Sequence, residues 1–444
     1  MAELTRYETY KPSGIDWIGN YPKHWEFRRL KNVCIVNKEA LTDKTPFDYL
    51  IEYIDIGNTT DNGDFLELQE IEFSEAPSRA RRKVEDGDTI ISTVRTYLRA
   101  IAFIENPKEN LIVSTGFAVL NPIKRTLVPK FLFYQVLCDS FIQRVIANSE
   151  GVSYPAISST KLADLKLFIP SVKEQICIAN YLDDQTQKID QLIANKKAQV
   201  EKLKELRQIE VNNAVTKGLN PNTEMKDSGI DWLGKIPKHW KVKRLKNTTF
   251  INQSVISEKT APDYLIKYID ISNVNSMGEF IELQEMEFSE APSRARRIPK
   301  HNSILLSTVR TYLRAIALVQ NPDKNLIAST GFAVIDANQN LFNASYLYFQ
   351  MISHFLVESV IANSEGVSYP AISSTKLGDI KIVIPPINEQ AEIANFLQQR
   401  TTAIDQLIKN NEAQIEKLQE LRKIRIYEAV TGKIKVNAYA EKTA

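Results

Sequence analysis

The sequence has few of the residues from which disulfides and structural metal sites are built. It contains only three cysteines, Cys34, Cys138 and Cys177, which lie far apart and form no CxxC motif. They cannot supply a disulfide framework or a zinc site, so we expect small core residues and no metal. No apolar run reaches the roughly 18 residues that a membrane span needs, and the polar start MAELTRYETY does not resemble a signal peptide. We therefore expect a cytoplasmic protein without a membrane partner.

The chain also lacks a strong charge of either sign. Lys and Arg number 56 against 54 Asp and Glu, which gives a net charge of +2, and 43% of the 444 residues are hydrophobic. These ordinary values exclude bulk disorder and a charged tail, and the net charge by itself does not indicate nucleic acid. The length predicts two or three domains.

A tandem repeat with a constant offset organises the chain. The run EFSEAPSRARR begins at Glu72 and again at Glu287, and IANSEGVSYPAISSTKL begins at Ile146 and again at Ile361, so both are displaced by 215 residues (287 − 72 and 361 − 146). Two copies predict a two-lobed protein, because a solenoid usually needs three or more stacked repeats.

Each copy combines two kinds of periodicity. Short β-rich runs such as Thr89–Val94 and Phe117–Leu120 are interrupted by one amphipathic helix from about Pro129 to Asn148, which predicts a mixed α+β domain. From Ser171 the apolar residues recur every three, four and seven positions, which predicts a long helix of about 40 residues, or roughly 60 Å. The second copy repeats this pattern.

We expect the two long helices to pack on each other as an antiparallel coiled coil, because the second domain must fold back between them. Lys196 and Asn411 occupy matching seam positions, which suits a wet contact that sets the register. The alternative is that each helix lies only on its own domain. The predicted fold class is α+β, with two tandem-repeated α/β domains joined by two long antiparallel helices in a pseudo-twofold arrangement. The predicted boundaries are domain 1–170, helix 171–217, domain 218–385, helix 386–432 and tail 433–444.

The copies share no constellation that would make an active site. His24 and His239 are the only histidines that occur in both copies, and each lies beside a Trp and a Lys. We interpret them as packing or polar-cap residues, and we predict no catalytic residue.

Both copies do share arginines with hydroxyl and aromatic residues close by. The planar fork of arginine suits guanine edges and phosphates, and small hydroxyls can hydrogen-bond the DNA backbone. The candidate DNA-binding residues are Arg79, Arg81, Arg82, Arg95, Tyr97, Arg99, Ser153 and Tyr154 in the first copy, and Arg294, Arg296, Arg297, Arg310, Tyr312, Arg314, Ser368 and Tyr369 in the second. Two alternatives remain open. In the first alternative, the arginines are only surface residues paired with Glu70, Glu72 and Glu75. In the second, the GVSYP turn is a loop that only caps the domain.

The order of these features resembles the specificity subunit of type I restriction-modification enzymes. The loop GVSYPAIS, a strand ending in Ile169-Pro170 or Ile384-Pro385, and a Glu-Gln pair that opens the long helix follow one another in both copies. The resemblance covers nearly the whole chain.

The resemblance implies that 1–170 and 218–385 are target-recognition domains, each reading one half of a bipartite double-stranded DNA target. It implies that the helices are spacers on which two methyltransferase (modification) subunits dock, and that restriction (motor and nuclease) subunits join the complex. It further implies that this chain is not an enzyme and carries no cofactor, so that S-adenosylmethionine, ATP and Mg belong to partner subunits.

Because the two copies are so alike, inverted domains should read nearly the same bases on opposite strands, which predicts a near-palindromic target. The copies differ at Thr59–Asp64 against Val274–Glu279, and the half-sites will differ slightly if this loop faces DNA. Two other function classes remain as alternatives: a self-contained DNA-modifying or DNA-cleaving enzyme, and a coiled-coil scaffold that does not bind DNA.

Overall fold

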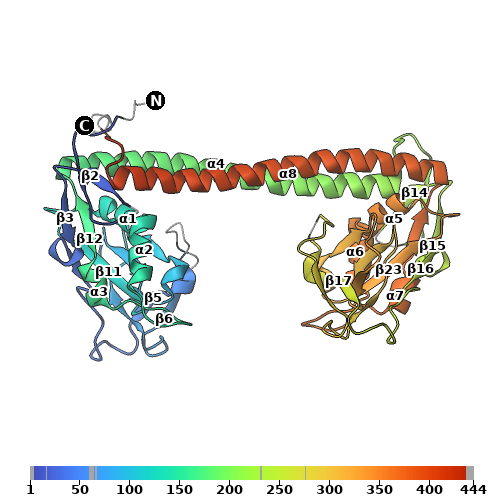
Figure 1. Ribbon diagram of the computed structural model, residues 1–444, viewed down its shortest axis with the longest axis horizontal. Coiled ribbons are helices and arrows are strands. Elements are labelled where there is room, and N and C mark those ends of the chain that lie inside the picture. The colour runs from blue at the N-terminus through green and yellow to red at the C-terminus, as the bar shows by residue number, and fades with distance from the viewer. Residues whose placement is uncertain are drawn as a thin grey trace. The chain divides into compact units, whose positions relative to one another are not determined.

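The computed structural model describes residues 5–16, 18–59, 65, 68–230, 233–275 and 277–436. The chain divides into two compact units, unit 1 with Met1–Asn195 and Gln414–Ala444, and unit 2 with Lys196–Ala413. Each unit contains the globular domain of one repeat and part of both long helices, α4 (Val172–Lys217) and α8 (Ile387–Val430) (Figure 1). Part of the loop Thr59–Asp64, from residue 60, and part of the tail, from residue 437, lie outside the described residues.

Unit 1 is built on two four-stranded sheets, ordered β6-β5-β10-β7 and β4-β11-β8-β9. Strand β10 pairs parallel with β5, whereas the other neighbours within these two sheets are antiparallel. The elements of its globular domain are β1 Tyr10–Pro12, β2 Asn20–Pro22, β3 Glu26–Arg29, β4 Cys34–Val36, β5 Leu50–Ile54, β6 Gln69–Glu72, β7 Ala80–Lys83, β8 Thr89–Ser92, β9 Ile101–Phe103, β10 Leu111–Ser114, β11 Phe117–Pro122, α1 Pro129–Leu137, α2 Asp139–Ala147, α3 Ser159–Asp164 and β12 Lys166–Ile169.

Unit 2 repeats this topology with sheets β18-β17-β22-β19 and β16-β23-β20-β21. The α+β class predicted from the alternating β-rich and helical patterns is confirmed in both units. The elements of its globular domain are β13 Met225–Asp227, β14 Lys235–Pro237, β15 Lys241–Arg244, β16 Thr249–Ile251, β17 Leu265–Ile269, β18 Gln284–Glu287, β19 Ala295–Arg297, β20 Ile304–Ser307, β21 Ile316–Leu318, β22 Leu326–Ser329, β23 Phe332–Ala337, α5 Ala344–Met351, α6 His354–Ala362, α7 Ser374–Asp379 and β24 Lys381–Ile384.

The prediction of a single helix over Pro129–Asn148 is wrong, because Cys138 interrupts the helix. Cys138 has an extended backbone (φ −64°, ψ 131°) between α1 and α2, and in unit 2 Ser353 breaks the chain between α5 and α6 in the same way. The Ser353 hydroxyl accepts a hydrogen bond from the backbone N–H of Leu356, which caps the second helix. The predicted burial of the three cysteines is confirmed.

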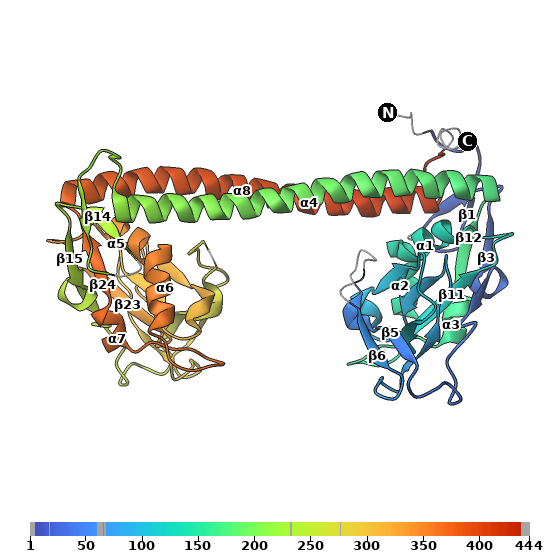
Figure 2. The same ribbon diagram turned by 180° about the vertical axis from the view of Figure 1, so that it is seen from behind.

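A Glu-Gln pair joins the start of each long helix to its domain. The carboxylate of Glu174 accepts hydrogen bonds from the backbone N–H of Ser171 (3.2 Å) and pairs with the Nε2 atom of His24 (2.9 Å). The next side chain, Gln175, is fully buried, and its amide nitrogen donates to the carbonyls of Thr126 and Pro170. His24 therefore lies at a polar helix cap, as predicted, and His239 makes the same contact with Glu389 at 2.8 Å. Figure 2 shows, from behind, the strand pairs β3–β12 and β15–β24, whose second strands lead into these helices.

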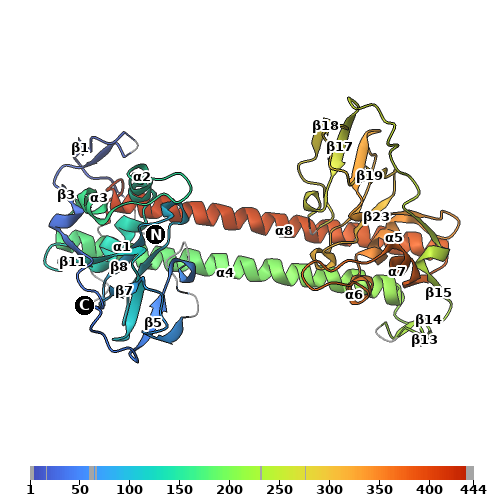
Figure 3. The ribbon, with the colours of Figure 1, turned by 90° about the horizontal axis from the view of Figure 1, so that it is seen from below.

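The two long helices pack against each other in antiparallel orientation within each unit (Figure 3). In unit 2 Lys196 donates to Asn411 (3.0 Å) and Arg207 donates to Asp405 (2.8 Å). The residue numbers fall along α8 where they rise along α4, so the two helices are antiparallel. Unit 1 contains the repeat copy of the second contact, which is Arg422 to Asp190 at 3.0 Å. The predicted helix pairing and the predicted contact of Lys196 with Asn411 at the seam are confirmed, and their role in setting the register stays a prediction.

One substitution between the copies changes the packing around α2 of unit 1 and α6 of unit 2. In unit 1 the guanidinium of Arg144 is buried, donates to the carbonyls of Ser140 and Lys166, and lies over the ring of Phe141 (5.2 Å). In unit 2 the equivalent residue is Ser359 (144 + 215), and a cavity of about 460 Å³ opens beside it. The position that carries a buried arginine in the first copy therefore lines an open pocket in the second.

Candidate nucleic-acid interface

Three segments that contain predicted DNA-binding residues meet at one edge of each domain. In unit 1 the N–H of Thr93 donates to the carbonyl of Gly116, the N–H of Ile157 donates to the carbonyl of Thr93, and the N–H of Thr115 donates to the carbonyl of Arg79. These bonds are 2.7–2.8 Å long and recur in unit 2 at the equivalent positions. The edge therefore brings together the segments that carry Arg79, Arg95 and Tyr154.

An arginine lies over a tyrosine ring at this edge in both units. The guanidinium carbon of Arg95 lies 4.9 Å from the ring centroid of Tyr154, and Arg310 lies at the same distance from Tyr369. Tyr154 is 66% exposed and Tyr369 67%, so the pairs are open to solvent. Cation–π attraction holds the guanidinium in place while its N–H edge remains free to bind a ligand.

A strained turn presents the residues beside these pairs. Residues Thr96–Leu98 form one turn of 3-10 helix, and Arg95 (φ 50°) and Arg99 (φ 54°) on either side are left-handed. Such conformations are costly for residues other than glycine, and they persist only where surrounding contacts impose them. Here the buried Thr96 hydroxyl is 3.0 Å from that of Ser149. Unit 2 has the same turn at Thr311–Leu313.

The turn and the adjacent loop expose large apolar side chains. We call the set in each unit the turn patch. It comprises Arg95, Tyr97, Leu98, Val152 and Tyr154 in unit 1, and Arg310, Tyr312, Leu313, Val367 and Tyr369 in unit 2. Ser153 and Ser368 lie exposed within the same loops. Leu98 and Val152 are not among the residues predicted from the sequence, because only polar and aromatic side chains were considered as candidates. The sequence signal that could have identified them is the presence of a large apolar residue within a segment rich in turn residues, where it is expected to be exposed.

The other predicted arginines are engaged in contacts within their own domain. Arg79 pairs with Asp55, and Arg294 with Asp270 at 2.6 Å. Arg99 forms an ion pair with Asp139 (2.5 Å), and Arg314 forms one with Glu358 (2.8 Å). The partners of Arg79 and Arg99 are therefore aspartates distant in sequence rather than the nearby glutamates considered above.

Arg81 and Arg82, with their copies, lie farther along the strands β7 and β19. Arg81 lies over the ring of Phe73 (4.6 Å), and Arg296 over that of Phe288 (5.3 Å). Burial lowers the pKa of Arg82 and of Arg297, and within the described residues the buried Nε atom of each has no hydrogen-bond acceptor. The DNA-binding role of all sixteen residues stays a prediction, and the geometry favours those of the turn patch.

The described part of the chain contains no group of three or more His, Cys, Asp or Glu side chains that could hold a metal ion. Within the same ranges, no helix has the length and apolar character required to cross a bilayer.

The sequence matches a known family twice. The family model for the type I restriction modification DNA specificity domain matches residues 22–202 and 237–417. The chain is 26% identical to the putative type I restriction enzyme MjaX specificity subunit of Methanocaldococcus jannaschii, over 98% of this chain and 99% of that protein. It is 24% identical to the MjaIX specificity subunit of the same organism, over 94% and 95% of the two chains.

Two solved structures share the fold. One is a chain from a study of complex assembly and conformational transition of the type I R-M system, with a TM-score of 0.71, 20% identity, and coverage of 93% of this chain and 99% of that chain. The other is the HsdS subunit from Thermoanaerobacter tengcongensis, with a TM-score of 0.51, 20% identity, and coverage of 93% and 98%. From the two family matches it follows that this chain belongs to the type I restriction-modification specificity family and is a non-catalytic DNA-recognition subunit with two target-recognition domains.

Proposed function

We propose that each turn patch reads one half of a bipartite double-stranded DNA target, and that the two halves form a near-palindrome. The observation that carries this proposal is the duplication of the arginine–tyrosine pair, with the same distance of 4.9 Å and the same left-handed turn in both units. Two surfaces of the same chemistry should bind nearly the same bases.

The chemistry of the patch suits a DNA groove. An arginine held over an aromatic ring keeps its planar fork in one orientation, and such a fork can donate two hydrogen bonds to the O6 and N7 atoms of guanine. The exposed side chains of Leu98 and Val152 can contact a thymine methyl group. Serine and arginine side chains at the rim would bind phosphates, which position the domain without reading sequence.

The partners proposed from the family are two methyltransferase (modification) subunits, with restriction subunits joining them. Support comes from exposed apolar residues on the long helices, which occur as repeat copies. Leu192 is 49% exposed and its copy Leu407 is 50% exposed, and Ile209 and its copy Ile424 are also exposed. Two equivalent apolar positions are suited to two identical partners. S-adenosylmethionine, ATP and Mg would then be held by those partners.

Selection of binding sites from random duplexes, with and without the methyltransferase subunit, tests the DNA proposal. We expect two short half-sites that are nearly inverted copies, separated by a gap of fixed length and unspecified sequence. Recovery of two unrelated half-sequences would refute the near-palindrome, and binding that ignores sequence would refute target reading.

Replacement of Leu192 and Leu407 by glutamate tests the docking proposal. We expect each single variant to retain one methyltransferase subunit and the double variant to retain none, as measured by the mass of the complex. The control is Lys197→Glu, which adds a glutamate at an exposed position of α4. Its repeat copy, Glu412 on α8, is already acidic and needs no substitution. Unchanged stoichiometry in the double variant would exclude this surface.

A further inference from the structure

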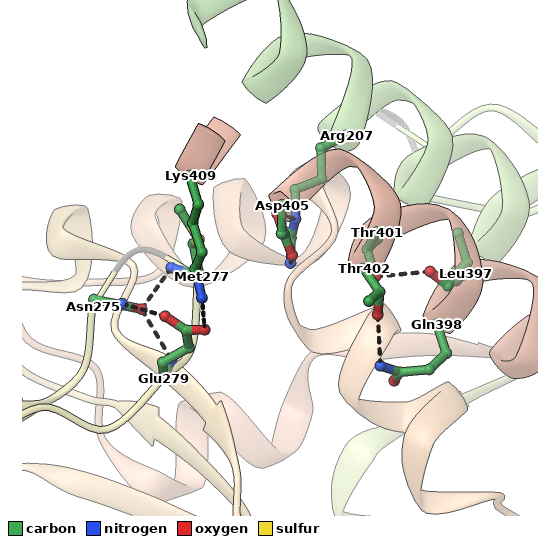
Figure 4. Close-up of polar contacts among 10 residues, drawn as sticks. All are labelled: Arg207, Asn275, Met277, Glu279, Leu397, Gln398, Thr401, Thr402, Asp405 and Lys409. Carbon is green, nitrogen blue, oxygen red and sulfur yellow. Dashed lines mark hydrogen bonds and ion pairs between the residues drawn. The ribbon is translucent and has the colours of Figure 1, made fainter. Parts of the chain in front are cut away.

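The second recognition domain touches the long helices through a loop that the first copy does not reproduce in sequence. The loop is Asn275–Glu279, of which residue 276 lies outside the described residues, and Figure 4 shows Asn275, Met277 and Glu279 beside Lys409 of α8 within unit 2. The carboxylate of Glu279 lies 2.7 Å from the ammonium group of Lys409 on α8. Met277 packs against a small apolar cluster formed by Val200, Ile404 and Ile408. Both contacts lie within the same compact unit.

Hydrogen bonds join the described residues of this loop to one another. The side-chain oxygen of Asn275 accepts from the backbone N–H groups of Met277 and Glu279, both at 2.9 Å, and its nitrogen donates to the Glu279 carboxylate. Gly278 (φ +79°) passes so close to the domain that an added Cβ would lie 2.6 Å from the Tyr348 hydroxyl. The loop is therefore wedged between α5 of the domain and the long helices.

This contact lies away from the attachment of the domain at the end of α4 and the start of α8, where the Tyr346 hydroxyl donates to the carbonyl of Val215 and the N–H of Phe355 donates to the side chain of Asn212. At the start of α8 the buried Gln390 also donates to the carbonyls of Leu341 and Pro385. Ile408 is 18 residues farther along α8 (408 − 390), which is about 27 Å at 1.5 Å per residue. A body attached at one point can tilt, whereas attachment at two distant points fixes its orientation.

The loop also lies next to the turn patch of unit 2. A cavity of about 270 Å³ is lined by Met277 and Gly278 on one side, by Leu313 and Arg314 on another, and by Asp405 of α8. A change in the conformation of the loop would therefore alter the surroundings of the segment that we propose to read DNA.

The first copy has other residues at these positions. Asn62 replaces Met277, Asp64 replaces Glu279 and Ala194 replaces Lys409. An alanine carries no charge, so no ion pair can form between the equivalents of Glu279 and Lys409. The difference in sequence between the two loops is thus matched by a difference on the helix.

We propose that the loop Asn275–Glu279 is a brace that fixes the orientation of the second recognition domain on its helices and thereby limits the gap length that the subunit accepts. The inference rests on the proposed bipartite reading of DNA. Met277 contributes more than the ion pair, because Glu279 and Lys409 are each about half exposed and exposed ion pairs contribute little.

The test uses the residues of the first copy as substitutions in the full-length chain with its methyltransferase partner. Met277→Asn and Lys409→Ala are combined, and binding is measured to duplexes whose gap is lengthened or shortened by one and two base pairs. We expect the native gap to be bound nearly as before, while the preference over the altered gaps falls by about tenfold, with a smaller effect of Lys409→Ala alone. Hydrogen exchange of residues 274–281 should accelerate in the same variant.

A matched variant in the first copy separates the possible failures. Asn62→Met, Asp64→Glu and Ala194→Lys introduce the brace residues there and should sharpen the gap preference. If the wild-type protein shows no gap preference, the proposed bipartite reading fails. If the wild type discriminates between gaps and Met277→Asn with Lys409→Ala leaves that profile unchanged, the brace is refuted while the bipartite reading stands.

Discussion

Arginine 95 provides the sharpest test of target reading by the turn patch. A bidentate contact from a guanidinium to guanine is worth about 1–3 kcal/mol of discrimination, so we expect Arg95→Ala to weaken binding to the selected site by about 2 kcal/mol, or roughly 30-fold. Binding to a site with that base pair replaced should hardly change. Because Arg310 lies in the same geometry, at 4.9 Å from its tyrosine, Arg310→Ala should cause an equal loss at the mirrored base pair.

The two residues lie in separate units, so their effects should add to about 4 kcal/mol, or roughly 1000-fold, in the double variant. Fluorescence anisotropy titrations against a panel of single-base-pair substitutions, each at several salt concentrations, measure these losses. The control Tyr154→Leu removes the ring under Arg95 and keeps the guanidinium. It should cost only about 0.5–1 kcal/mol, the worth of an exposed cation–π contact. A uniform loss over all sequences, with a shallower salt dependence, would make Arg95 a phosphate contact and refute base reading.

Three further predictions concern stability, each measured by urea unfolding. Arg207→Met should destabilise unit 2 by about 3 kcal/mol, because the Asp405 carboxylate, only 21% exposed, loses its cation. The double variant Arg207→Met with Asp405→Leu should regain most of the lost stability. Arg144→Ser should destabilise unit 1 by about 2 kcal/mol by opening a cavity like that beside Ser359, and a stability equal to wild type would show that the site collapses instead. Burial raises the pKa of Asp88 from 3.8 to about 6, so the native state binds a proton in this range that the unfolded state does not. Its contribution to stability therefore falls as pH rises from 3.8 to 6, and Asp88→Asn should remove that part of the pH dependence, which an unchanged profile would contradict.

Much of the fold was predictable because its signals lie within short stretches of sequence. The repeat is visible as identical runs, and the long helices as an apolar period bounded by Pro170 at the start and Gly218 after the end. The seam contact of Lys196 with Asn411 followed from their matching positions in that period.

The errors and omissions arose where distant contacts decide the conformation. The break at Cys138 was missed because α1 and α2 both bury apolar residues in the same core, so the apolar pattern continues through it. The left-handed backbone of Arg95 and Arg99 has no local signal, since no glycine or asparagine marks it. The pairing of Arg79 with Asp55 joins residues 24 positions apart, whereas the alternative from sequence considered only near neighbours.

The contact between Lys196 and Asn411 joins one position of the repeat to its own copy, because 411 − 196 equals the repeat offset of 215. In a pair of identical half-length chains arranged in the same way, this position would meet itself. Lysine against lysine would place two ammonium groups together, whereas asparagine against asparagine could hydrogen-bond. Fusion of the two halves into one polypeptide allows a mixed pair that no homodimer can form. The seam thus ties the two different halves to each other and disfavours the pairing of two first halves from separate molecules.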